Sequence, residues 1–253
     1  MHSEEARRTV QVLSIPIDVL TEEQALDRIV HWAHNAESRY VAICNSHVVV
    51  TGSREPDFGK VLNNADMATA DGAPVAWLMR RLGHERQPRV SGPDLMLSLC
   101  ERAAQERLPI YFFGSSEQTL GLLQANLTKR YPGLIIAGAC SPPFRKLSAE
   151  EDAELIGRVV ESSARIVFVG LGCPKQERWM FEKKGRINAV MLGVGAAFDF
   201  HAGTITRAPL WMRNCGLEWL HRLLSEPRRL WKRYLVTNFL FVVGAVRQLL
   251  ARA

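Results

Sequence analysis

The stretch that decides the fold is IVFVGLGCPKQE, residues 166–177. An apolar run at 166–169 is followed by glycines at 170 and 172, and then by Pro174. An unbroken run of β-branched and aromatic residues predicts a strand that is covered on both faces. Proline suits the first turn of a helix, because the N–H that it lacks needs no partner there. The stretch therefore predicts a strand, a glycine turn and a helix, the repeating unit of an α/β fold.

The same alternation of strand and helix continues on both sides of this stretch. Three capping boxes predict helices that begin just after the first residue of each pair. The pairs are Thr21 with Gln24, Ser115 with Gln118, and Ser148 with Glu151. Further strands are predicted at 10–13, 40–44, 67–70, 109–113, 134–139 and 189–194. We expect an α/β fold: a mostly parallel, Rossmann-like sheet with helices on both faces, followed by a basic helical C-terminal appendage.

Composition excludes several classes of protein. The chain has 253 residues, of which 47% are hydrophobic and 23% charged, and such a composition is that of a folded globular chain. Its five cysteines are odd in number and lack paired spacing, which argues against a disulfide framework and a zinc site. The first ten residues hold no apolar run typical of a signal peptide, so we expect a cytoplasmic protein.

Charge is concentrated at the C-terminal end. The whole chain carries a net charge of +6, yet nine basic residues and only two glutamates fall from Arg207 onward. We therefore expect an α/β core over 1–206 and a basic, tryptophan-rich, membrane-associating appendage over 207–253. Such a tail suits an anionic membrane surface or a nucleic acid. A merely solvated charged face is the alternative.

The appendage contains an apolar stretch at 235–246, which is shorter than the roughly 20 residues that a membrane-spanning helix needs. Basic and aromatic residues alternate just before it, and this mixture suits the headgroup layer of a bilayer. The expected membrane contacts are Arg228, Arg229, Trp231, Lys232 and Arg233. The alternative is that the apolar stretch packs on the core.

Residues at the predicted strand ends could carry chemistry. Asp71 ends the 67–70 strand, where a carboxylate faces the ligand crevice and could accept a proton, although an Asp-Gly turn is the plainer alternative. Arg89 could face a phosphate or a carboxylate. Helix N-termini and glycine turns favour phosphates, and Asp199 could bond a ribose or a base. The candidate nucleotide contacts are Gly114, Gly170, Gly172, Lys175, Gln176, Gly195 and Asp199.

Other familiar motifs are missing from the sequence. Gly-Leu-Gly lacks the third glycine of a dinucleotide fingerprint, and there is no Asp-x-Asp, His-Glu-x-x-His or Gly-x-Ser-x-Gly. The absence of paired carboxylates predicts a reaction that needs no metal. A Rossmann-type oxidoreductase with an oligomerising tail remains an alternative, as does a nucleic-acid-binding protein, although the latter has no recognisable binding motif.

Five segments together resemble the WecG/TagA/CpsF family of bacterial glycosyltransferases over about residues 10–240. They are Asn45 with the helix after it, 70–75, 89–95, 170–177, and 208–219. The resemblance implies an inverting, metal-independent transfer from a UDP-sugar, without further cofactor, to a polyprenyl-diphosphate-linked acceptor. It places the enzyme peripherally at the inner face of the cytoplasmic membrane, with no nucleic acid bound, and a homo-oligomer is possible.

The resemblance also assigns roles to residues. Asp71 matches the family's proposed base and Arg89 its motif arginine, while Asn45 and Gln176 are substrate contacts. The appendage is expected to cover the site and to bring in an arginine, with Arg207, Arg213 and Arg222 as candidates. Ile43 stands where many teichoic-acid enzymes have threonine, so the donor sugar stays open between N-acetylmannosamine, its uronic acid, and glucose.

Overall fold

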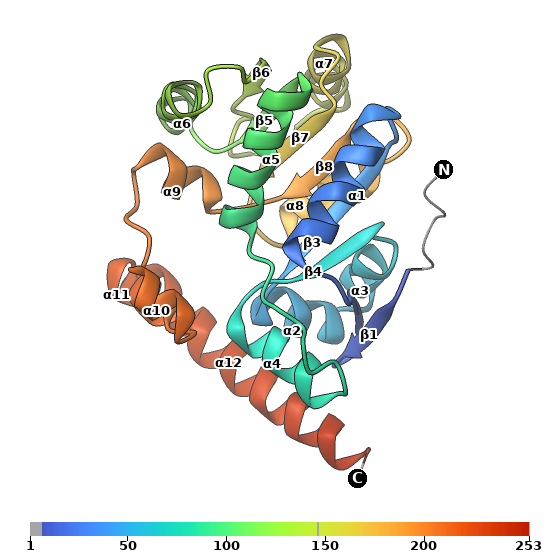
Figure 1. The fold of residues 1–253 in the computed structure, drawn as a ribbon, viewed down its shortest axis with the longest axis vertical. Coiled ribbons are helices and arrows are strands. Elements are labelled where there is room, and N and C mark those ends of the chain that lie inside the picture. Colours follow the sequence, from blue (N-terminus) through green and yellow to red (C-terminus); the bar gives the residue numbers. More distant parts are fainter. Residues whose placement is uncertain (1–6, 146, 253) are drawn as a thin grey trace. The chain divides into compact units, whose positions relative to one another are not determined.

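A computed structural model of the chain describes residues 7–145 and 147–252, and its main sheet has six strands (Figure 1). Across the sheet the order is β4 (Met67–Ala70), β3 (Arg39–Cys44), β8 (Val190–Gly193), β7 (Ile166–Gly170), β5 (Ile110–Gly114) and β6 (Ile136–Cys140). The pairs β3–β8, β8–β7, β7–β5 and β5–β6 are parallel. The predicted α/β fold with a parallel sheet, flanking helices and a C-terminal helix is confirmed.

Helices connect the strands and form the C-terminal segment. Those of the body are α1 (Glu22–His34), α2 (Ser46–Arg54), α3 (Pro56–Asn63), α4 (Ala73–Arg81), α5 (Gly92–Glu106), α6 (Glu117–Arg130), α7 (Ala149–Glu161), α8 (Lys175–Lys183) and α9 (Ala197–Ala202). Those of the tail are α10 (Leu210–Asn214), α11 (Glu218–Ser225) and α12 (Pro227–Leu250). Residues 7–22, 43–91 and 207–252 form one compact unit, and residues 23–42 and 92–206 form a second.

The second unit is built on tight packing between β5 and β7. Phe112 stacks on Phe168 with ring centroids 5.8 Å apart, and Phe198 of α9 meets Phe112 edge-on at 5.6 Å. At the carboxyl ends of these strands, a Cβ on Gly114 would lie 2.6 Å from the carbonyl carbon of Gly170. Only glycine at position 114 permits this approach, since its φ of 116° also disfavours other residues.

The first unit contains a hairpin that the sequence did not predict. The strand expected at 10–13 exists as β1 (Thr9–Val12), but it pairs antiparallel with β2 (Ile15–Asp18) outside the main sheet. Leu13 makes the two-residue turn with φ 59°, without the glycine or asparagine that signals such turns. The buried Asp18 side chain attaches the hairpin to β4, because its Oδ2 accepts from the Ala68 N–H at 2.7 Å.

Helix starts follow the predicted capping patterns with one exception. Ser148 and Glu151 form the complete capping box of α7, and Asn45 caps α2 by accepting from the N–H groups of His47 and Val48. The prediction for Ser115 was wrong by one position. Ser115 has φ 65°, whereas an N-cap residue takes an extended conformation, and Ser116 in that conformation accepts from the Thr119 N–H.

The tail helix α12 has one packed face and one exposed face. Leu230, Phe241 and Ala245 are buried, and α12 packs against α2. Gln248 is bonded to the β1–β2 hairpin, donating to the Gln11 carbonyl and accepting from the Leu13 N–H. No helix in the described ranges is both long enough and apolar enough to cross a bilayer.

Candidate active site

Asp71 directly follows β4, as expected. Its N–H donates to the Cys44 carbonyl at 3.1 Å, which joins the ends of β4 and β3. Gly72, with φ 85°, turns the chain into α4, and a Cβ there would lie 3.8 Å from the Asn45 Cβ. Asp71 and Asn45 are therefore neighbours at the carboxyl edge of the sheet. The Asp71 side chain is 20% exposed, so it is reachable from solvent.

The segment before α5 brings Arg89 beside Asp71. The Val90 N–H donates to the Ala70 carbonyl at 2.9 Å, so this segment runs along the end of β4. Upstream, the buried amide of Gln87 exchanges hydrogen bonds with the backbone of Leu20, which anchors the segment. Arg89 Nε consequently lies 3.8 Å from Asp71 Oδ1. The two residues that sequence reasoning assigned to catalysis are thus in contact.

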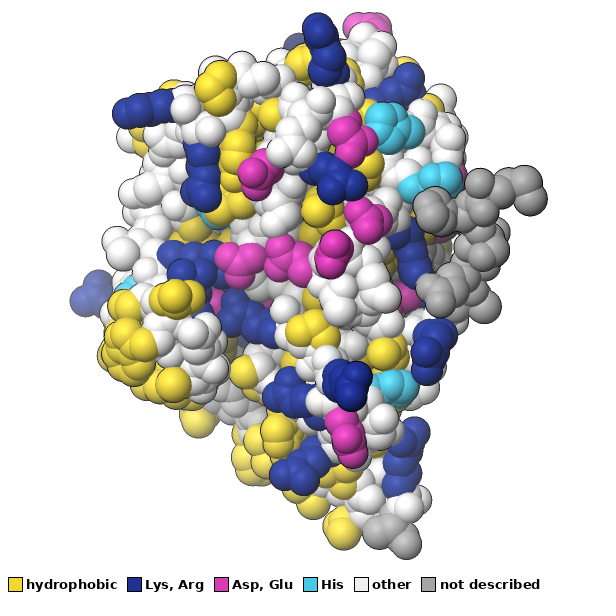
Figure 2. All heavy atoms as spheres, viewed as in Figure 1, with side chains coloured by type: hydrophobic (Ala, Val, Ile, Leu, Met, Phe, Trp, Pro, Cys, Tyr) yellow, Lys and Arg dark blue, Asp and Glu magenta, His cyan; other side chains and the backbone are white. Residues whose placement is uncertain are grey.

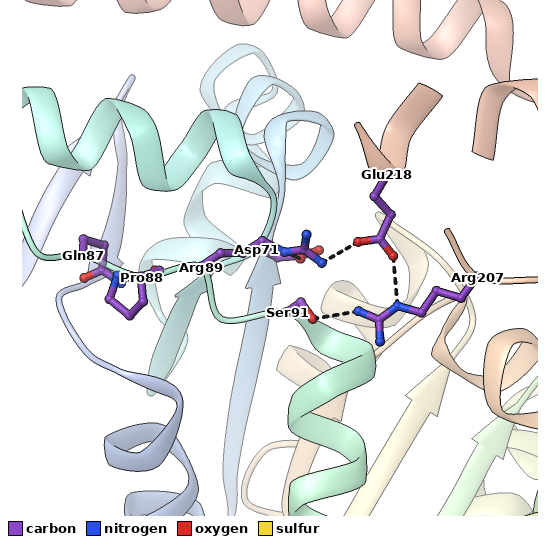
Figure 3. Close-up of polar contacts among 7 residues, drawn as sticks. All are labelled: Asp71, Gln87, Pro88, Arg89, Ser91, Arg207 and Glu218. Atoms are coloured by element: carbon purple, nitrogen blue, oxygen red, sulfur yellow. Dashed lines mark hydrogen bonds and ion pairs between the residues drawn. The ribbon is translucent and has the colours of Figure 1, made fainter. Parts of the chain in front are cut away.

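A glutamate from the tail completes this cluster (Figure 3). Glu218, the first residue of α11, accepts from Arg89 Nη2 through Oε2 at 2.5 Å and from Arg207 Nε through Oε1 at 3.0 Å. Arg207 Nη2 also donates to Ser91 Oγ at 3.4 Å. Two carboxylates and two guanidiniums therefore alternate in a row, each with a side chain 15–20% exposed.

Sequence reasoning missed Glu218 as a site residue. The glutamate lies more than 120 positions from Arg89 along the chain, and only its place in the 208–219 segment was a signal. Its position depends on a glycine, because a Cβ on Gly216 would lie 2.7 Å from the Ala73 Cβ. The turn before α11 thereby packs against the start of α4, close to Asp71.

The second unit has its own polar cluster after β7. Gln176, on the first turn of α8, is 4% exposed. Its Oε1 accepts from the Gly172 N–H at 3.2 Å, while its Nε2 donates to the Gly193 carbonyl at 3.0 Å and to Glu177 Oε1 at 2.9 Å. The amide thus joins the turn after β7 to the end of β8, and its role as a substrate contact stays a prediction.

Glu177 is the other residue of this cluster, and sequence reasoning did not single it out. It is fully buried, and burial raises the pKa of its carboxyl from 4.5 to about 7, against smaller lowering effects of hydrogen bonds from Gln176 and Cys173. Its Oε2 has no hydrogen-bond partner among the described residues. A carboxyl this buried is held close to the point of losing its proton at neutral pH.

The remaining predicted nucleotide contacts surround these turns within the second unit. Gly114 touches Gly170, and a Cβ on Gly195 would lie 3.6 Å from Gln176 Oε1. Lys175 begins α8, while Asp199 lies on α9, where its carbonyl accepts from Thr204. The residues predicted for catalysis and those predicted for the nucleotide therefore fall into two separate groups, one in each compact unit.

Basic residues of α12 approach α2 inside the first unit. Burial lowers the pKa of His47 to about 4, with a smaller contribution from the positive charge of Arg233. His47 Nδ1 and Arg233 Nε are buried without hydrogen-bond partners in the part of the chain that the structure describes. Trp231 is half exposed beside Lys232, and Arg229 pairs with Glu226 at 2.7 Å. Arg213 lies on the short helix α10.

Clustered metal ligands are not found in the described ranges: no three His, Cys, Asp or Glu side chains there lie together as a cation site requires. The polar groups at the sheet edge instead include two guanidiniums and two partly exposed carboxylates, those of Asp71 and Glu218. Parallel sheets of this kind bind their ligands outside the carboxyl ends of the strands. The fold is thus α/β, and charged side chains lie at the ligand edge of its sheet.

The comparisons identify the class of protein. Residues 10–253 match the family described as "Glycosyl transferase WecG/TagA/CpsF family", and the chain belongs to it. A relative from Bacillus spizizenii is 29% identical over 197 residues, which cover 78% of this chain and 74% of the relative. It is named N-acetylglucosaminyldiphosphoundecaprenol N-acetyl-beta-D-mannosaminyltransferase. The protein is therefore a glycosyltransferase, and the alternative of a Rossmann-type oxidoreductase is wrong.

Proposed function

We propose that this glycosyltransferase moves a sugar from a UDP-sugar to a polyprenyl-diphosphate-linked saccharide in cell-surface polysaccharide synthesis, with inversion and without a metal. The name of the Bacillus spizizenii relative favours N-acetylmannosamine as the donor sugar and an N-acetylglucosaminyl lipid as the acceptor. The contact between Asp71 and Arg89, at the carboxyl edge of the sheet in a chain of this family, is the observation that carries the proposal.

In this reaction Asp71 takes the proton of the acceptor hydroxyl. The hydroxyl oxygen bonds to the anomeric carbon from the side opposite UDP, and UDP leaves with the electron pair of the bond that breaks. Without a metal, the charge that develops on UDP requires fixed cations and amides. Arg89, Arg207 and Arg213, all in the first unit, offer guanidiniums for this charge.

We propose that the tail docks on the inner face of the cytoplasmic membrane, where the lipid acceptor resides. Hydrophobic side chains gather on the surface where Figure 1 shows α10–α12, with basic side chains among them (Figure 2). The exposed apolar side chains of α12 include Leu235, Val236, Phe239, Val242 and Val246. The basic residues in the first turns of α12 also favour an anionic surface.

Product analysis tests this function. The purified enzyme is incubated with a polyprenyl-diphosphate N-acetylglucosamine and a panel of UDP-sugars, with and without EDTA. We expect one lipid product by mass spectrometry, a β-linkage from an α-linked donor by NMR, and no loss in EDTA. Asp71→Asn should lower kcat about 10²- to 10⁴-fold while UDP still binds. Wild-type turnover in this variant, or activity that EDTA abolishes and Mn²⁺ restores, would contradict the mechanism.

A further inference from the structure

We infer that Glu218 is a positioning residue for the transfer reaction: it shares the guanidinium of Arg89 with Asp71 and so leaves the Asp71 carboxylate able to accept a proton. The inference rests on the proposed role of Asp71 as the base. Glu218 contacts Arg89 and Arg207 (Figure 3), so its effect on Asp71 passes through Arg89.

One edge of the Arg89 guanidinium faces both carboxylates. Nε and one terminal nitrogen of a guanidinium form an edge that ordinarily holds both oxygens of a single carboxylate. In this cluster the edge is divided. Nη2 donates to Glu218 at 2.5 Å, and Nε stays 3.8 Å from Asp71 Oδ1, beyond hydrogen-bond length.

Glu218 is itself held in place from a second side. Arg207 Nε donates to its other oxygen at 3.0 Å, and Ser91 Oγ accepts from Arg207 Nη2 at 3.4 Å. Gly216 allows the turn before α11 to pack on Ala73, which fixes the direction from which Glu218 approaches. The carboxylate therefore cannot follow Arg89 toward Asp71 without leaving Arg207.

This division of Arg89 bears directly on the chemistry of a general base. A carboxylate that pairs through both oxygens with an arginine has a lowered pKa and is therefore a weaker base. Arg89 from the 87–91 segment pairs with Asp71 and with Glu218 from α11, and Glu218 pairs in turn with Arg207 from the start of the tail. His47, on the first turn of α2, has a pKa of about 4 and is neutral above pH 5.

Glu218→Gln tests whether Glu218 keeps Arg89 from pairing closely with Asp71. A glutamine has one acceptor oxygen and one donor nitrogen at its end, so it cannot accept from Arg89 and Arg207 through two separate oxygens as Glu218 does. We expect Arg89 to close on Asp71, and the acidic limb of the kcat–pH profile to move down by about one unit. The kcat at pH 7 should fall roughly three- to tenfold, while UDP affinity changes by less than about threefold.

Arg207→Gln provides a test of opposite sign. It leaves Glu218 to Arg89 alone and removes a positive charge, so the pKa of Asp71 should rise. The pKa is measured by ¹³C NMR titration of the Asp71 carboxyl carbon, assigned by its disappearance in Asp71→Asn. Glu154→Gln breaks an exposed glutamate–arginine pair on α7 and serves as the control, with no expected change in the Asp71 titration.

The outcomes are distinguishable. A lowered Asp71 pKa in Glu218→Gln and a raised one in Arg207→Gln support the inference, while unchanged values in both variants overturn it. Should Glu218→Gln fail to fold, the Arg207→Gln titration alone decides. Should the Asp71 pKa move as expected while Asp71→Asn keeps full turnover, the positioning of Arg89 stands and the proposed base is rejected.

Discussion

The side chain of Gln176 lies against the backbone of Gly193, and its Nε2 donates to the glycine carbonyl at 3.0 Å. A Cβ at position 193 would come within 2.9 Å of the same nitrogen, so the contact requires glycine there. One buried amide therefore fixes the turn that follows β7 relative to the end of β8. The same amide therefore orders the turn at 170–172, which the sequence predicts to contact the nucleotide.

Replacing Gln176 by methionine keeps the shape of the side chain and removes its three hydrogen bonds. The Gly193 carbonyl and Glu177 Oε1 would lose partners in a buried place, and each such loss costs about 1–3 kcal/mol. We expect Gln176→Met to lower the free energy of unfolding by about 2–4 kcal/mol in urea titrations. Gln124→Met on α6 removes one side-chain hydrogen bond at a partly exposed site and should cost under about 1 kcal/mol. Equal losses in both variants would contradict the role of the cluster.

Glu177 should make stability depend on pH in the neutral range. A carboxyl whose pKa is higher in the folded chain than in the unfolded chain holds its proton more tightly when folded. The folded state therefore loses stability as the pH rises from 4.5 to about 7. Glu177→Gln cannot ionise and escapes this loss. We expect its free energy of unfolding, relative to wild type, to increase by about 3 kcal/mol between pH 4.5 and pH 8. A constant difference in urea titrations across this range would show that Glu177 ionises normally.

The sequence predicted the main sheet well because its strands are buried on both faces and read as unbroken apolar runs. It did not predict the β1–β2 hairpin, because Leu13 takes the positive φ of the turn where glycine or asparagine is expected. Pro16 also lies in the second strand, where proline is uncommon. Asp71 and Arg89 were readable because each follows or precedes a predicted element. Glu218 was not, because the tertiary fold alone brings α11 to β4, and the buried state of Glu177 likewise depends on packing that no local pattern encodes.

Substitution by alanine should change the stability of the fold in opposite directions at Gly114 and Gly121. At Gly114 the backbone has φ 116° and a Cβ would strike the Gly170 backbone, whereas Gly121 lies inside α6 with open space around it. We expect Gly114→Ala to destabilise the fold by at least about 2 kcal/mol. Gly121→Ala should stabilise it by about 0.5–1 kcal/mol, because alanine is the better helix former. Thermal unfolding measures both, and a tolerated Gly114→Ala would mean that β5 and β7 separate there at little cost.

The exposed face of α12 should control binding to membranes. Phe239 is 66% exposed on this face, and burying such a side chain in lipid contributes about 1.5–3 kcal/mol. We expect Phe239→Asp to weaken binding to vesicles that contain anionic lipid by at least about tenfold in flotation assays. The charged residues at the start of α12 should make binding to the same vesicles weaker at high salt, since salt screens exposed charges.

Leu122→Asp is the matched control for this surface. Leu122 is 42% exposed on α6 and receives the same charge, but it lies outside the tail. Its binding to vesicles should equal that of the wild type, because neither the apolar face nor the basic turns of α12 are altered. Equal weakening in both variants would assign the effect to net charge, and unchanged binding in Phe239→Asp would remove α12 from the membrane contact. Phe239 is exposed, whereas Leu230, Phe241 and Ala245 are the buried side chains of α12. Its substitution should therefore leave the melting temperature unchanged. A change in flotation then reports on docking and not on folding.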